Sequence, residues 1–452
     1  MDHDLTLEEI SARIGEPVEE LRRWQSLGLI GVEAGDRFRP EDVDRAKLVQ
    51  LLLGRGIGLD AIGKVENEHP FLDREVERLF PDSKGPRLSL AAAAEMIALD
   101  LDVAWRFWQA GNLGDESELD QDDVTALRAL HTALLAGFPE EALLQLFRVF
   151  ADSMDRVAEA TGRAFHFYVH EPLRASLGSA EESRWRSEEV VDQVLPLFEP
   201  SILYFLRKGG EKAARDDVVM HVAEEAGLLP VAAAPGQMTR AIVFTDLSSF
   251  TPLTDAMGDA EAVAVLQRFS NIVREATRRG NGRVVKQIGD AFMLVFPDAS
   301  SAVTCAVEIE SRTGEEPQFP AARSGVHWGD ALYREGDYVG TNVNIASRIA
   351  GEAERHQVVV TAAARKHVGA MPGVEFARLG KRRLKGVAEE LELFEARSNV
   401  AVSKEKTVDP VCGMELGPEE VAARLSLEGQ ERTFCSDECL RRFVATPERY
   451  PS

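Results

Sequence analysis

The sequence has few cysteines, no long apolar run and a shortage of basic side chains, and each shortage excludes a class of protein. Only 4 of 452 residues are cysteine, too few for a disulfide-stabilised fold, so we expect a reducing, cytoplasmic location. No apolar run approaches the roughly 20 residues of a membrane span, and the acidic N-terminus lacks the apolar stretch of a signal peptide. The net charge of −24 argues against binding of nucleic acid or anionic membranes by the whole surface.

The length and the local composition indicate several domains. At roughly 100–200 residues per domain, 452 residues exceed one compact core. An Ala-, Gly- and Pro-rich stretch (224–239) and a polar stretch (398–408) predict linkers. We therefore expect a multidomain α+β protein. Its predicted parts are a helical subdomain (1–80), a second helical subdomain with a linker (81–235), a mixed domain (236–397), a linker (398–408) and a small cysteine-containing module (409–452).

The N-terminal half has the apolar periodicity of helices. The clearest predicted helices are Leu7–Ile14, Pro17–Leu27, Pro40–Arg55 and Val124–Ala136. Thr6 followed by Glu9 forms a capping-box signature, and Pro17 suits a first helical position. A weak internal repeat relates Leu5–Gln25 to Leu88–Gln109, so we expect two related helical subunits.

The mixed domain alternates strand and helix patterns. The predicted order is strand Ala241–Thr245, helix Asp259–Arg279, strands Arg283–Ile288 and Phe292–Phe296, helix Ala299–Arg312 and strand Ala322–His327. Gly289 and Asp290 form the turn of the predicted hairpin. This β-α-β-β-α-β order is that of a ferredoxin-like sheet covered by helices.

Two aspartates follow strands that such a sheet places side by side. Asp246 comes directly after the first strand, and Asp290 lies in the hairpin turn. Paired carboxylates at a strand end suit Mg²⁺ when phosphate oxygens complete its coordination shell. Taken singly, each aspartate is equally well explained as a turn residue.

Further motifs accompany these aspartates in a specific order. They are F-T-D-L-S-S-F-T (Phe244–Thr251), K-Q-I-G-D (Lys286–Asp290), H-W-G (His327–Gly329), D-Y-V-G-T-N-V-N-I-A-S-R (Asp337–Arg348) and L-K-G (Leu384–Gly386). The set resembles the catalytic domain of class III adenylate and guanylate cyclases over about residues 238–397. The resemblance implies that Asp246 and Asp290 hold two Mg²⁺ or Mn²⁺ ions on the triphosphate, where the ribose 3′-hydroxyl attacks the α-phosphorus.

The same resemblance implies roles for other residues. Arg348 matches the arginine that stabilises the transition state, Asn344 matches the residue that orients the ribose, and Lys385 matches, less securely, a triphosphate-binding lysine. The loop that leads to Phe250 and Thr251 is expected to hold phosphate through backbone N–H groups.

Base selection and oligomeric state also follow from the resemblance. Lys286 and Asp337 match the two purine-selecting positions; a lysine can donate to adenine N1 and an aspartate can accept from the N6 amino group. Guanine would leave that aspartate facing a carbonyl, so ATP is expected rather than GTP. In the family, opposite protomers supply the metal ligands and the Asn/Arg set. One chain with both sets therefore predicts a C2 homodimer.

The N-terminal region carries a second resemblance. Leu21–Ile30, L-R-R-W-Q-S-L-G-L-I, resembles the helix-turn-helix of MerR-type regulators, and residues 1–230 resemble the helical regulatory region of some actinobacterial class III cyclases. Residues 1–80 carry 18 acidic and 11 basic side chains, which argues against DNA binding and favours a structural use of the motif. His166, His170 and His221 are candidate pH sensors or ordinary surface or core histidines.

The C-terminal module combines D-P-V-C-G-M, F-C-S-D-E-C and a terminal P-E-R-Y, and it resembles the YHS domain. Cys412, Cys435 and Cys439 supply three thiolates for Zn²⁺ or Cu⁺. A fourth ligand has to come from Asp437, Glu438 or water. The alternative is a small apolar core with free thiols.

These observations define competing hypotheses. The first is an adenylate cyclase that converts ATP to 3′,5′-cyclic AMP and pyrophosphate and is regulated by its flanking domains. The second is a DNA-binding transcriptional regulator that binds DNA through residues 1–80 and senses nucleotide through a non-catalytic cyclase-like domain. The third is a metal-responsive scaffold in which the YHS module dominates. The full set of six cyclase positions and the acidic surface favour the first.

Overall fold

The computed structural model describes ten stretches of the chain, residues 5–31, 37–68, 70–79, 88–114, 119–177, 179–227, 234–387, 389–399, 406–427 and 429–450. The chain divides into two compact units, Met1–Val218 and Val219–Ser452, which are described separately below. No helix among the described residues is both long and apolar enough to cross a membrane.

The first unit begins with a bundle of short helices. These are α1 (Leu7–Ile14), α2 (Val18–Ser26), α3 (Pro40–Gly54), α4 (Leu59–Glu68) and α5 (Leu72–Leu79). The predicted capping box of Thr6 and Glu9 is confirmed, because each side chain accepts a hydrogen bond from the other's backbone. Pro17 occupies the N-cap of α2, one position before the helical residue that we predicted. Leu21 and Trp24 of α2 are buried in the core of this bundle.

The predicted internal repeat is confirmed by α6 (Leu90–Met96), α7 (Leu101–Ala110) and α8 (Gln121–Leu135). Each copy opens with a residue in an isolated antiparallel bridge, Leu5 with Phe38 in the first and Leu88 with Leu119 in the second. The second helix of each copy buries a tryptophan, and the third begins with a capping box. The two copies therefore use the same packing scheme.

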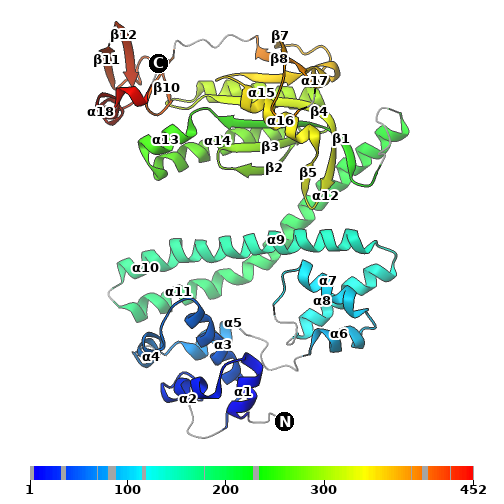
Figure 1. Cartoon of the computed structure of the whole chain (residues 1–452), viewed down its shortest axis with the longest axis vertical. Helices are drawn as coiled ribbons and strands as arrows, with labels where there is room; N and C mark the ends of the chain where they lie inside the picture. The colour runs from blue at the N-terminus through cyan, green and yellow to red at the C-terminus, as the bar shows by residue number, and fades with distance from the viewer. Residues whose placement is uncertain are drawn as a thin grey trace. The chain divides into compact units, whose positions relative to one another are not determined.

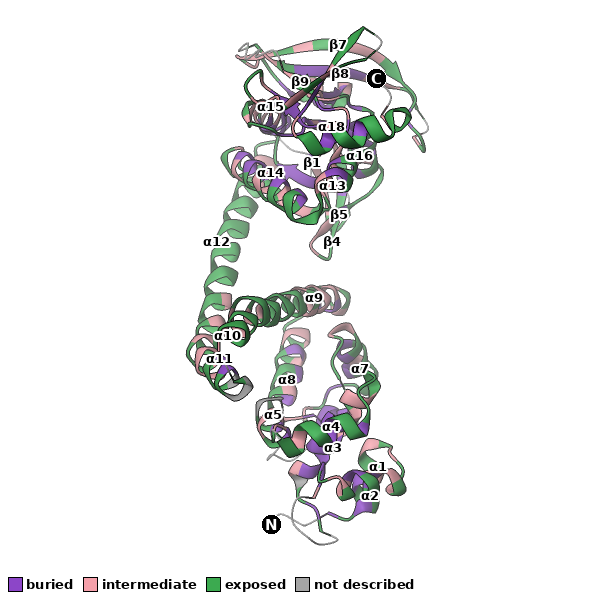
Figure 2. Ribbon diagram, turned by 90° about the vertical axis from the view of Figure 1, so that its left-hand side faces the viewer, coloured by how far each residue is buried: buried purple, intermediate pink, exposed green. Residues whose placement is uncertain are grey.

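Long helices complete the first unit. They are α9 (Glu140–Phe165), the π-helix η1 (His166–His170), α10 (Glu171–Ser176), α11 (Ala180–Val194), the 3-10 turn η2 (Leu195–Leu197) and α12 (Phe198–Glu225), which continues into the second unit. Several large apolar side chains on them are exposed, among them Tyr168 and Phe205. Figure 2 shows α12 coloured as exposed along most of its length.

The second unit is built on one mixed sheet. Its elements are β1 (Gln237–Leu247), α13 (Phe250–Met257), α14 (Asp259–Arg279), β2 (Arg283–Ile288), β3 (Ala291–Phe296), α15 (Ala299–Glu315), β4 (Ala322–Arg334), β5 (Asp337–Val339), α16 (Thr341–Glu352), β6 (Val358–Thr361), α17 (Ala362–His367), β7 (Val374–Arg382) and β8 (Leu391–Ser398). The strand order is β2-β3-β1-β4-β6-β8-β7, with β5 paired to β4 (Figure 1). Its first four strands have the ferredoxin-like order, which confirms the predicted fold class.

The first strand is longer than the apolar pattern predicted. β1 begins at Gln237, inside the predicted linker 224–239, and its first residues pair with the end of β4. Gln237 and Thr239 donate hydrogen bonds to the Asp330 carboxylate on β4. Polar side chains therefore hold this end of the strand at a solvent-exposed edge, where an apolar pattern cannot reveal it.

The two faces of the sheet are covered unequally. Ala241 and Val243 of β1 point into the large core formed with α14 and α15. The intervening Ile242 points to the opposite face, where it packs with Val343 and Ala346 of α16. Phe244 and Val285 at the edge of this second cluster are only partly buried. One face is thus fully covered, whereas the other is covered by one helix.

The C-terminal module is the last part of the second unit and packs against its sheet domain. It consists of β9 (Thr407–Val408), β10 (Glu415–Leu416), β11 (Ala423–Leu427), β12 (Gln430–Phe434), α18 (Asp437–Ala445) and η3 (Pro447–Arg449). Phe434 and Phe443 belong to the same core cluster as the helices below the sheet. Figure 1 shows the module beside α13. The predicted linker 398–408 lies partly outside the described residues, and its last two residues form β9.

Candidate active site

The two predicted metal-binding aspartates come together at one end of β1. Asp246 lies near the end of that strand, and Asp290 lies in the turn between β2 and β3. Burial raises the pKa of Asp290, and the charge of Asp246 raises it further, whereas backbone N–H groups of Leu247 and Asp290 lower it. The two carboxylates are therefore close enough for their charges to interact, as a shared cation site requires.

An arginine that the sequence reasoning missed balances these carboxylates. Arg323 lies opposite Asp246 in the β1–β4 pairing. Its Nε and Nη2 donate to the two Asp246 carboxylate oxygens at 2.6 and 3.1 Å. These hydrogen bonds raise the pKa of Arg323, and the charge of Asp290 adds to the effect. The antiparallel register of β1 and β4 was the signal that would have identified it.

The loop after Asp246 is held in an uncommon backbone conformation. Ser249 has a φ of 68° in the left-handed region, which costs a residue with a Cβ about 1–2 kcal/mol. Arg355 donates to the Ser249 hydroxyl at 3.3 Å. Phe250 then begins α13 and is partly buried, while Thr251 is exposed. A tight loop that leads into a helix is a suitable place for phosphate oxygens.

The two predicted purine-selecting residues contact each other directly. The Nζ of Lys286 on β2 forms an ion pair and hydrogen bond with Oδ2 of Asp337 at the start of β5. The backbone N–H of Tyr338 donates to the other Asp337 oxygen at 2.7 Å. Both side chains of the pair are more than one-third accessible, so a purine edge can reach them.

The remaining predicted residues lie apart from the carboxylates. Asn344 and Arg348 are exposed on α16, whereas Val343 and Ala346 of the same helix are buried against the sheet. Within the described residues, neither Asn344 nor Arg348 has a side-chain partner. Lys385 is exposed in the turn after β7. The structure thus brings Asp246 to Asp290 and Lys286 to Asp337, but it does not bring the α16 pair to either set.

A second cluster of side chains that could hold a metal ion lies in the C-terminal module. The Sγ atoms of Cys412 and Cys439 lie 3.5 and 3.6 Å from that of Cys435. One oxygen of Asp409 completes a group whose four donor atoms all lie within 4.8 Å of one another. The fourth group is therefore Asp409 and not Asp437 or Glu438. Glu438 instead forms ion pairs with arginines of its own helix.

Asp409 also organises the backbone of this cluster. Its two carboxylate oxygens accept hydrogen bonds from the N–H groups of Val411 and Cys435, both at 2.8 Å. Burial raises its pKa. Hydrogen bonds with the thiols of Cys412 and Cys435 lower the pKa of Cys439. Cys305, in contrast, is an isolated core thiol whose pKa burial raises to about 12.

The three candidate sensor histidines lie on the long helices. His166 and His170 stack with ring centroids 5.8 Å apart in the π-helix, and His166 is 3.7 Å from Glu171. His170 shares a 3.4 Å hydrogen bond with Ser187 of α11. His221 lies on α12. The rings of the first two belong to one local cluster, and a sensing role for any of them stays a prediction.

Three family models match parts of the chain. The MerR HTH family regulatory protein model matches residues 5–68, the adenylate cyclase regulatory domain model matches residues 39–208, and the YHS domain model matches residues 407–452. The chain is 29% identical over 372 residues to the pH-sensitive adenylate cyclase of Mycobacterium tuberculosis, covering 80% of this chain and 90% of that protein. It is 28% identical over 275 residues to an adenylate cyclase of Streptomyces coelicolor, covering 60% and 69%.

The solved structures that are similar to this chain include adenylate cyclase domains that cover about a third of it. An adenylate cyclase from Trypanosoma brucei has a TM-score of 0.33 and 21% identity, covering 36% of this chain and 90% of that one. The fold assignment rests on the strand order of the second unit rather than on this score. Together, the family models and the relatives confirm the resemblance that the motifs indicate. The chain resembles regulated adenylate cyclases, with a MerR-like helix-turn-helix at its start and a YHS domain at its end.

Proposed function

We propose that the protein is an adenylate cyclase that converts ATP to 3′,5′-cyclic AMP and pyrophosphate. The observation that carries this proposal is the placement of the six cyclase positions on one domain as two sets. The carboxylates and the lysine–aspartate pair lie around the sheet, and the Asn344 and Arg348 pair points outward from α16. Relatives named as adenylate cyclases support the same activity.

Asp246 and Asp290 are the proposed ligands of two Mg²⁺ or Mn²⁺ ions. Their paired carboxylates are hard oxygen donors, which fits these ions. When bound, the ions would acidify the ribose 3′-hydroxyl and neutralise the charge of the departing pyrophosphate. In the absence of substrate, the positive charge of Arg323 partly neutralises the carboxylates of Asp246 and Asp290. A guanidinium at this position would also suit the phosphate oxygens of a bound nucleotide, because it can donate two parallel hydrogen bonds.

Lys286 and Asp337 are the proposed purine-selecting pair. The lysine donates to adenine N1, and the aspartate accepts a hydrogen bond from the N6 amino group. Guanine offers an N1–H and a C6 carbonyl instead, so both protein groups would lose their partners. The existing ion pair keeps the two side chains together at the position where the base edge has to bind.

The active form is proposed to be a homodimer. Asn344 and Arg348 lie on the side of α16 opposite to the sheet, so one chain cannot direct them to its own carboxylates. The less covered face of the sheet also carries exposed apolar side chains, including Ile288 and Tyr333. A C2 dimer through this face would build two equivalent sites from both chains.

The test is cyclic nucleotide formation by the full-length protein with ATP or GTP and Mg²⁺ or Mn²⁺. We expect cyclic AMP from ATP. Asp246→Ala and Arg348→Ala should each be inactive, and an equal mixture that exchanges subunits should recover about a quarter of the original activity, because half of the dimers contain one intact site. No product under any of these conditions, with nucleotide still bound, would rule out the enzyme.

A second function is suggested by the match of residues 5–68 to the MerR helix-turn-helix model. Arg22 and Arg23 of α2 are exposed and could meet phosphates. The acidic excess of residues 1–80 opposes such binding. Sequence-specific retention of DNA that falls steeply with salt would support this function, and its absence at low salt would exclude it.

The C-terminal cluster is proposed to take a thiophilic ion, Zn²⁺ or Cu⁺. Cys412, Cys435 and Cys439 are the proposed ligands, and a role for this ion in the enzyme is developed below.

A further inference from the structure

The C-terminal module touches the loop that follows the first metal-binding aspartate. Gly413 has a φ of 74°, and a Cβ at this position would collide with the Cβ of Ser249. Gly413 directly follows Cys412 of the thiol cluster, whereas Ser249 lies three residues after Asp246. The absence of a side chain at Gly413 therefore permits a direct contact between the knuckle (409–414) and the loop that contains Ser249. More than one hundred residues of sequence separate these two segments.

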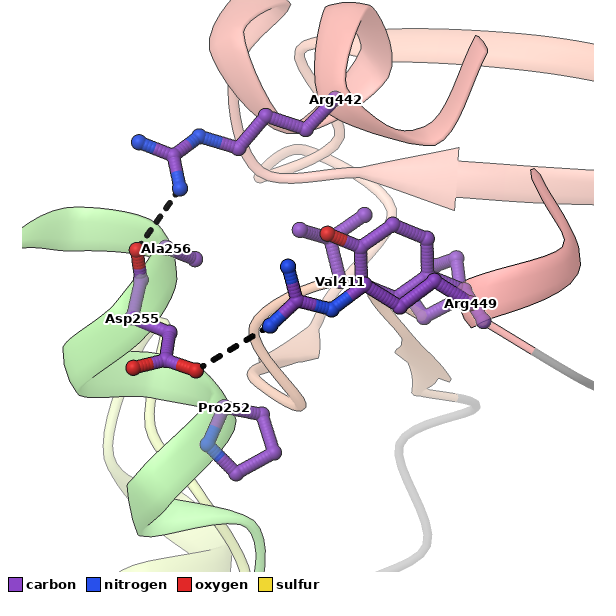
Figure 3. A pocket seen from close by; sticks show the side chains of 8 residues that line it. Pro252, Asp255, Ala256, Val411, Arg442 and Arg449 are labelled. Atoms are coloured by element: carbon purple, nitrogen blue, oxygen red, sulfur yellow. Dashed lines mark hydrogen bonds and ion pairs between the residues drawn. The ribbon is translucent and has the colours of Figure 1, made fainter. Parts of the chain in front are cut away.

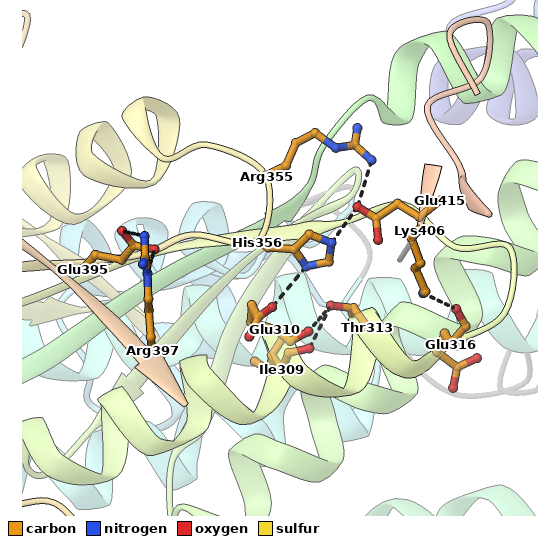
Figure 4. A network of polar contacts seen from close by, with 10 residues as sticks. All are labelled: Ile309, Glu310, Thr313, Glu316, Arg355, His356, Glu395, Arg397, Lys406 and Glu415. Carbon is orange, nitrogen blue, oxygen red and sulfur yellow. Dashed lines mark hydrogen bonds and ion pairs between the residues drawn. The ribbon is translucent and has the colours of Figure 1, made fainter. Parts of the chain in front are cut away.

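Arg355 ties the two segments together. It lies between α16 and β6, and its guanidinium donates to the Ser249 hydroxyl at 3.3 Å and to the Gly413 carbonyl at 2.9 Å. The same group lies 3.4 Å from the Glu415 carboxylate, as Figure 4 shows. Arg355 thus links the knuckle to Ser249, the residue with the left-handed backbone conformation.

Other contacts fix the module on the catalytic part. His356 lies between Glu310 of α15 and Glu415 of β10, at 3.1 and 2.6 Å (Figure 4). The Glu415 N–H donates to the Phe319 carbonyl at 3.1 Å. On the other side, Arg442 donates to the Asp255 carbonyl at 2.7 Å, across a cavity of about 420 Å³ that Figure 3 shows. The module is therefore held against the catalytic part at two places, Glu415 and Arg442.

The thiol cluster has the dimensions of a structural zinc site. Zn–S bonds of about 2.3 Å in a tetrahedron place sulfurs about 3.8 Å apart. The observed separations of 3.5 and 3.6 Å are close to that value and far longer than the roughly 2.0 Å of a disulfide. Asp409, Cys412 and Cys439 are buried and Cys435 is half-buried. Three thiolates with one carboxylate suit Zn²⁺ better than Cu⁺, because Cu⁺ prefers sulfur alone.

We propose that Asp409, Cys412, Cys435 and Cys439 bind Zn²⁺ and that the bound ion sets the activity of the catalytic site through the Gly413–Ser249 contact. This proposal rests on the proposed cyclase function for its readout. The ion joins the knuckle to β12 and α18, so Cys412 and the adjacent Gly413 are held in place. Gly413 and Arg355 then keep Ser249 in its left-handed conformation beside Asp246. Without the ion the knuckle is free to shift, and the loop loses that support.

The first experiment measures zinc binding by the full-length protein. After removal of metal with a strong chelator, exchange into reducing buffer, addition of zinc and removal of the excess, we expect one Zn²⁺ per chain by elemental analysis and by competition with a chromogenic chelator. A Cys435→Ser/Cys439→Ser variant should bind no zinc. In a parallel titration with Cu⁺ and a competing ligand, the protein should bind Cu⁺ more weakly than Zn²⁺. Absence of zinc binding, or disulfide formation in its place, would overturn the proposal.

The second experiment measures turnover at saturating ATP and Mg²⁺. Removal of zinc should lower kcat about fivefold or more, the factor expected when a left-handed residue loses the contact that holds it. One equivalent of zinc should restore the original rate. The Cys435→Ser/Cys439→Ser variant should turn over at the low rate with or without zinc. Because this variant keeps the Asp246 site, that result would exclude an effect of zinc at Asp246.

A further variant tests whether zinc binding and the effect of zinc on turnover can be separated. Arg355→Gln should still bind one Zn²⁺ but turn over at the zinc-free rate whether or not zinc is present. Arg378→Gln, which removes an exposed arginine paired with Glu392 on the neighbouring strand, is the matched control and should respond like the unaltered protein. Zinc binding with no change in turnover would overturn the coupling, whereas zinc binding by a protein that makes no cyclic nucleotide at all would instead overturn the proposed function.

Discussion

Two clusters of proposed ion ligands flank the loop around Ser249, and they are built in opposite ways. The first has two carboxylates at an open strand end, with Arg323 as a neutralising cation. The second has three thiols and one carboxylate, mostly buried, with backbone N–H groups on the carboxylate. Hard, accessible ligands allow an ion to enter and leave with each nucleotide, whereas buried soft ligands retain an ion as part of the fold. Under the two proposals above, one unit of the protein would hold an exchangeable ion at the first cluster and a structural ion at the second.

The largest expected effect comes from removing a ligand of the open cluster. Asp290→Ala should lower cyclic AMP formation by at least about a thousandfold, because loss of a metal ligand removes several kcal/mol of transition-state stabilisation. The zinc content of the C-terminal module should not change. If the variant keeps activity within tenfold of the original, Asp290 is not a metal ligand. The proposed difference between an open carboxylate site and a buried thiol site would then no longer hold.

The next largest effect is expected at the residue proposed to recognise the base, which does not contact the ions. Lys286→Glu should lower the rate with ATP about a hundredfold and change the ATP-to-GTP preference, because an acceptor replaces the donor to adenine N1 and can instead accept from guanine. Rates with both nucleotides at several concentrations measure it. The conservative change Lys286→Arg is the control and should retain a preference for ATP. An unaltered preference in Lys286→Glu would place base selection elsewhere.

A smaller effect tests how firmly the buried cluster is docked. Hydrogen bonds to Glu310 and Glu415 raise the pKa of His356 to about 9, while burial opposes them. Because the pKa in the folded protein is raised above its ordinary value of 6.5, this stability is fully present below pH 6.5 and is lost as pH rises through about 9. His356→Gln should lower the unfolding free energy of the second unit by about 2 kcal/mol.

Thermal unfolding between pH 6 and 10 measures this loss. The difference between His356→Gln and the unaltered protein should shrink toward the alkaline end. His367→Gln, at an exposed ring outside this interface, is the control and should show no such pH dependence. A difference that stays constant with pH would mean that the charge of His356 does not hold the module.

The smallest effect has the opposite sign. Burial and the charge of Asp246 raise the pKa of Asp290 above its ordinary value, so ionised Asp290 destabilises the metal-free fold at neutral pH. Asp290→Asn should therefore raise the melting temperature by a few degrees at most while it abolishes activity. The gain should vanish as the pH falls through the range where Asp290 becomes protonated. An unchanged or lower melting temperature at pH 7 would show that Arg323 compensates the charge completely.

The sequence predicted the elements of both clusters better than it predicted their partners. Apolar periodicity located α1, α14, β2 and the ferredoxin-like order, because local patterns determine these elements. It missed Arg323 and Asp409, whose importance arises from long-range pairing. Arg323 meets Asp246 across 77 positions, and Asp409 meets Cys435 across 26. The docking of the YHS module was not foreseen either: Arg355 belongs to none of the motifs, and Gly413, although part of D-P-V-C-G-M, gives no sign of its contact with Ser249.

The ion pair between Lys286 and Asp337 has a consequence for how nucleotides are sorted. In the proposed site each group is already satisfied by the other before any base arrives. Adenine therefore enters by exchange: it breaks one ion pair and replaces it with two hydrogen bonds, so the net gain in affinity is small. A base with the wrong edge breaks the same pair and offers nothing in return. Such a site selects between bases by the hydrogen bonds that each base returns and not by the tightness of binding alone.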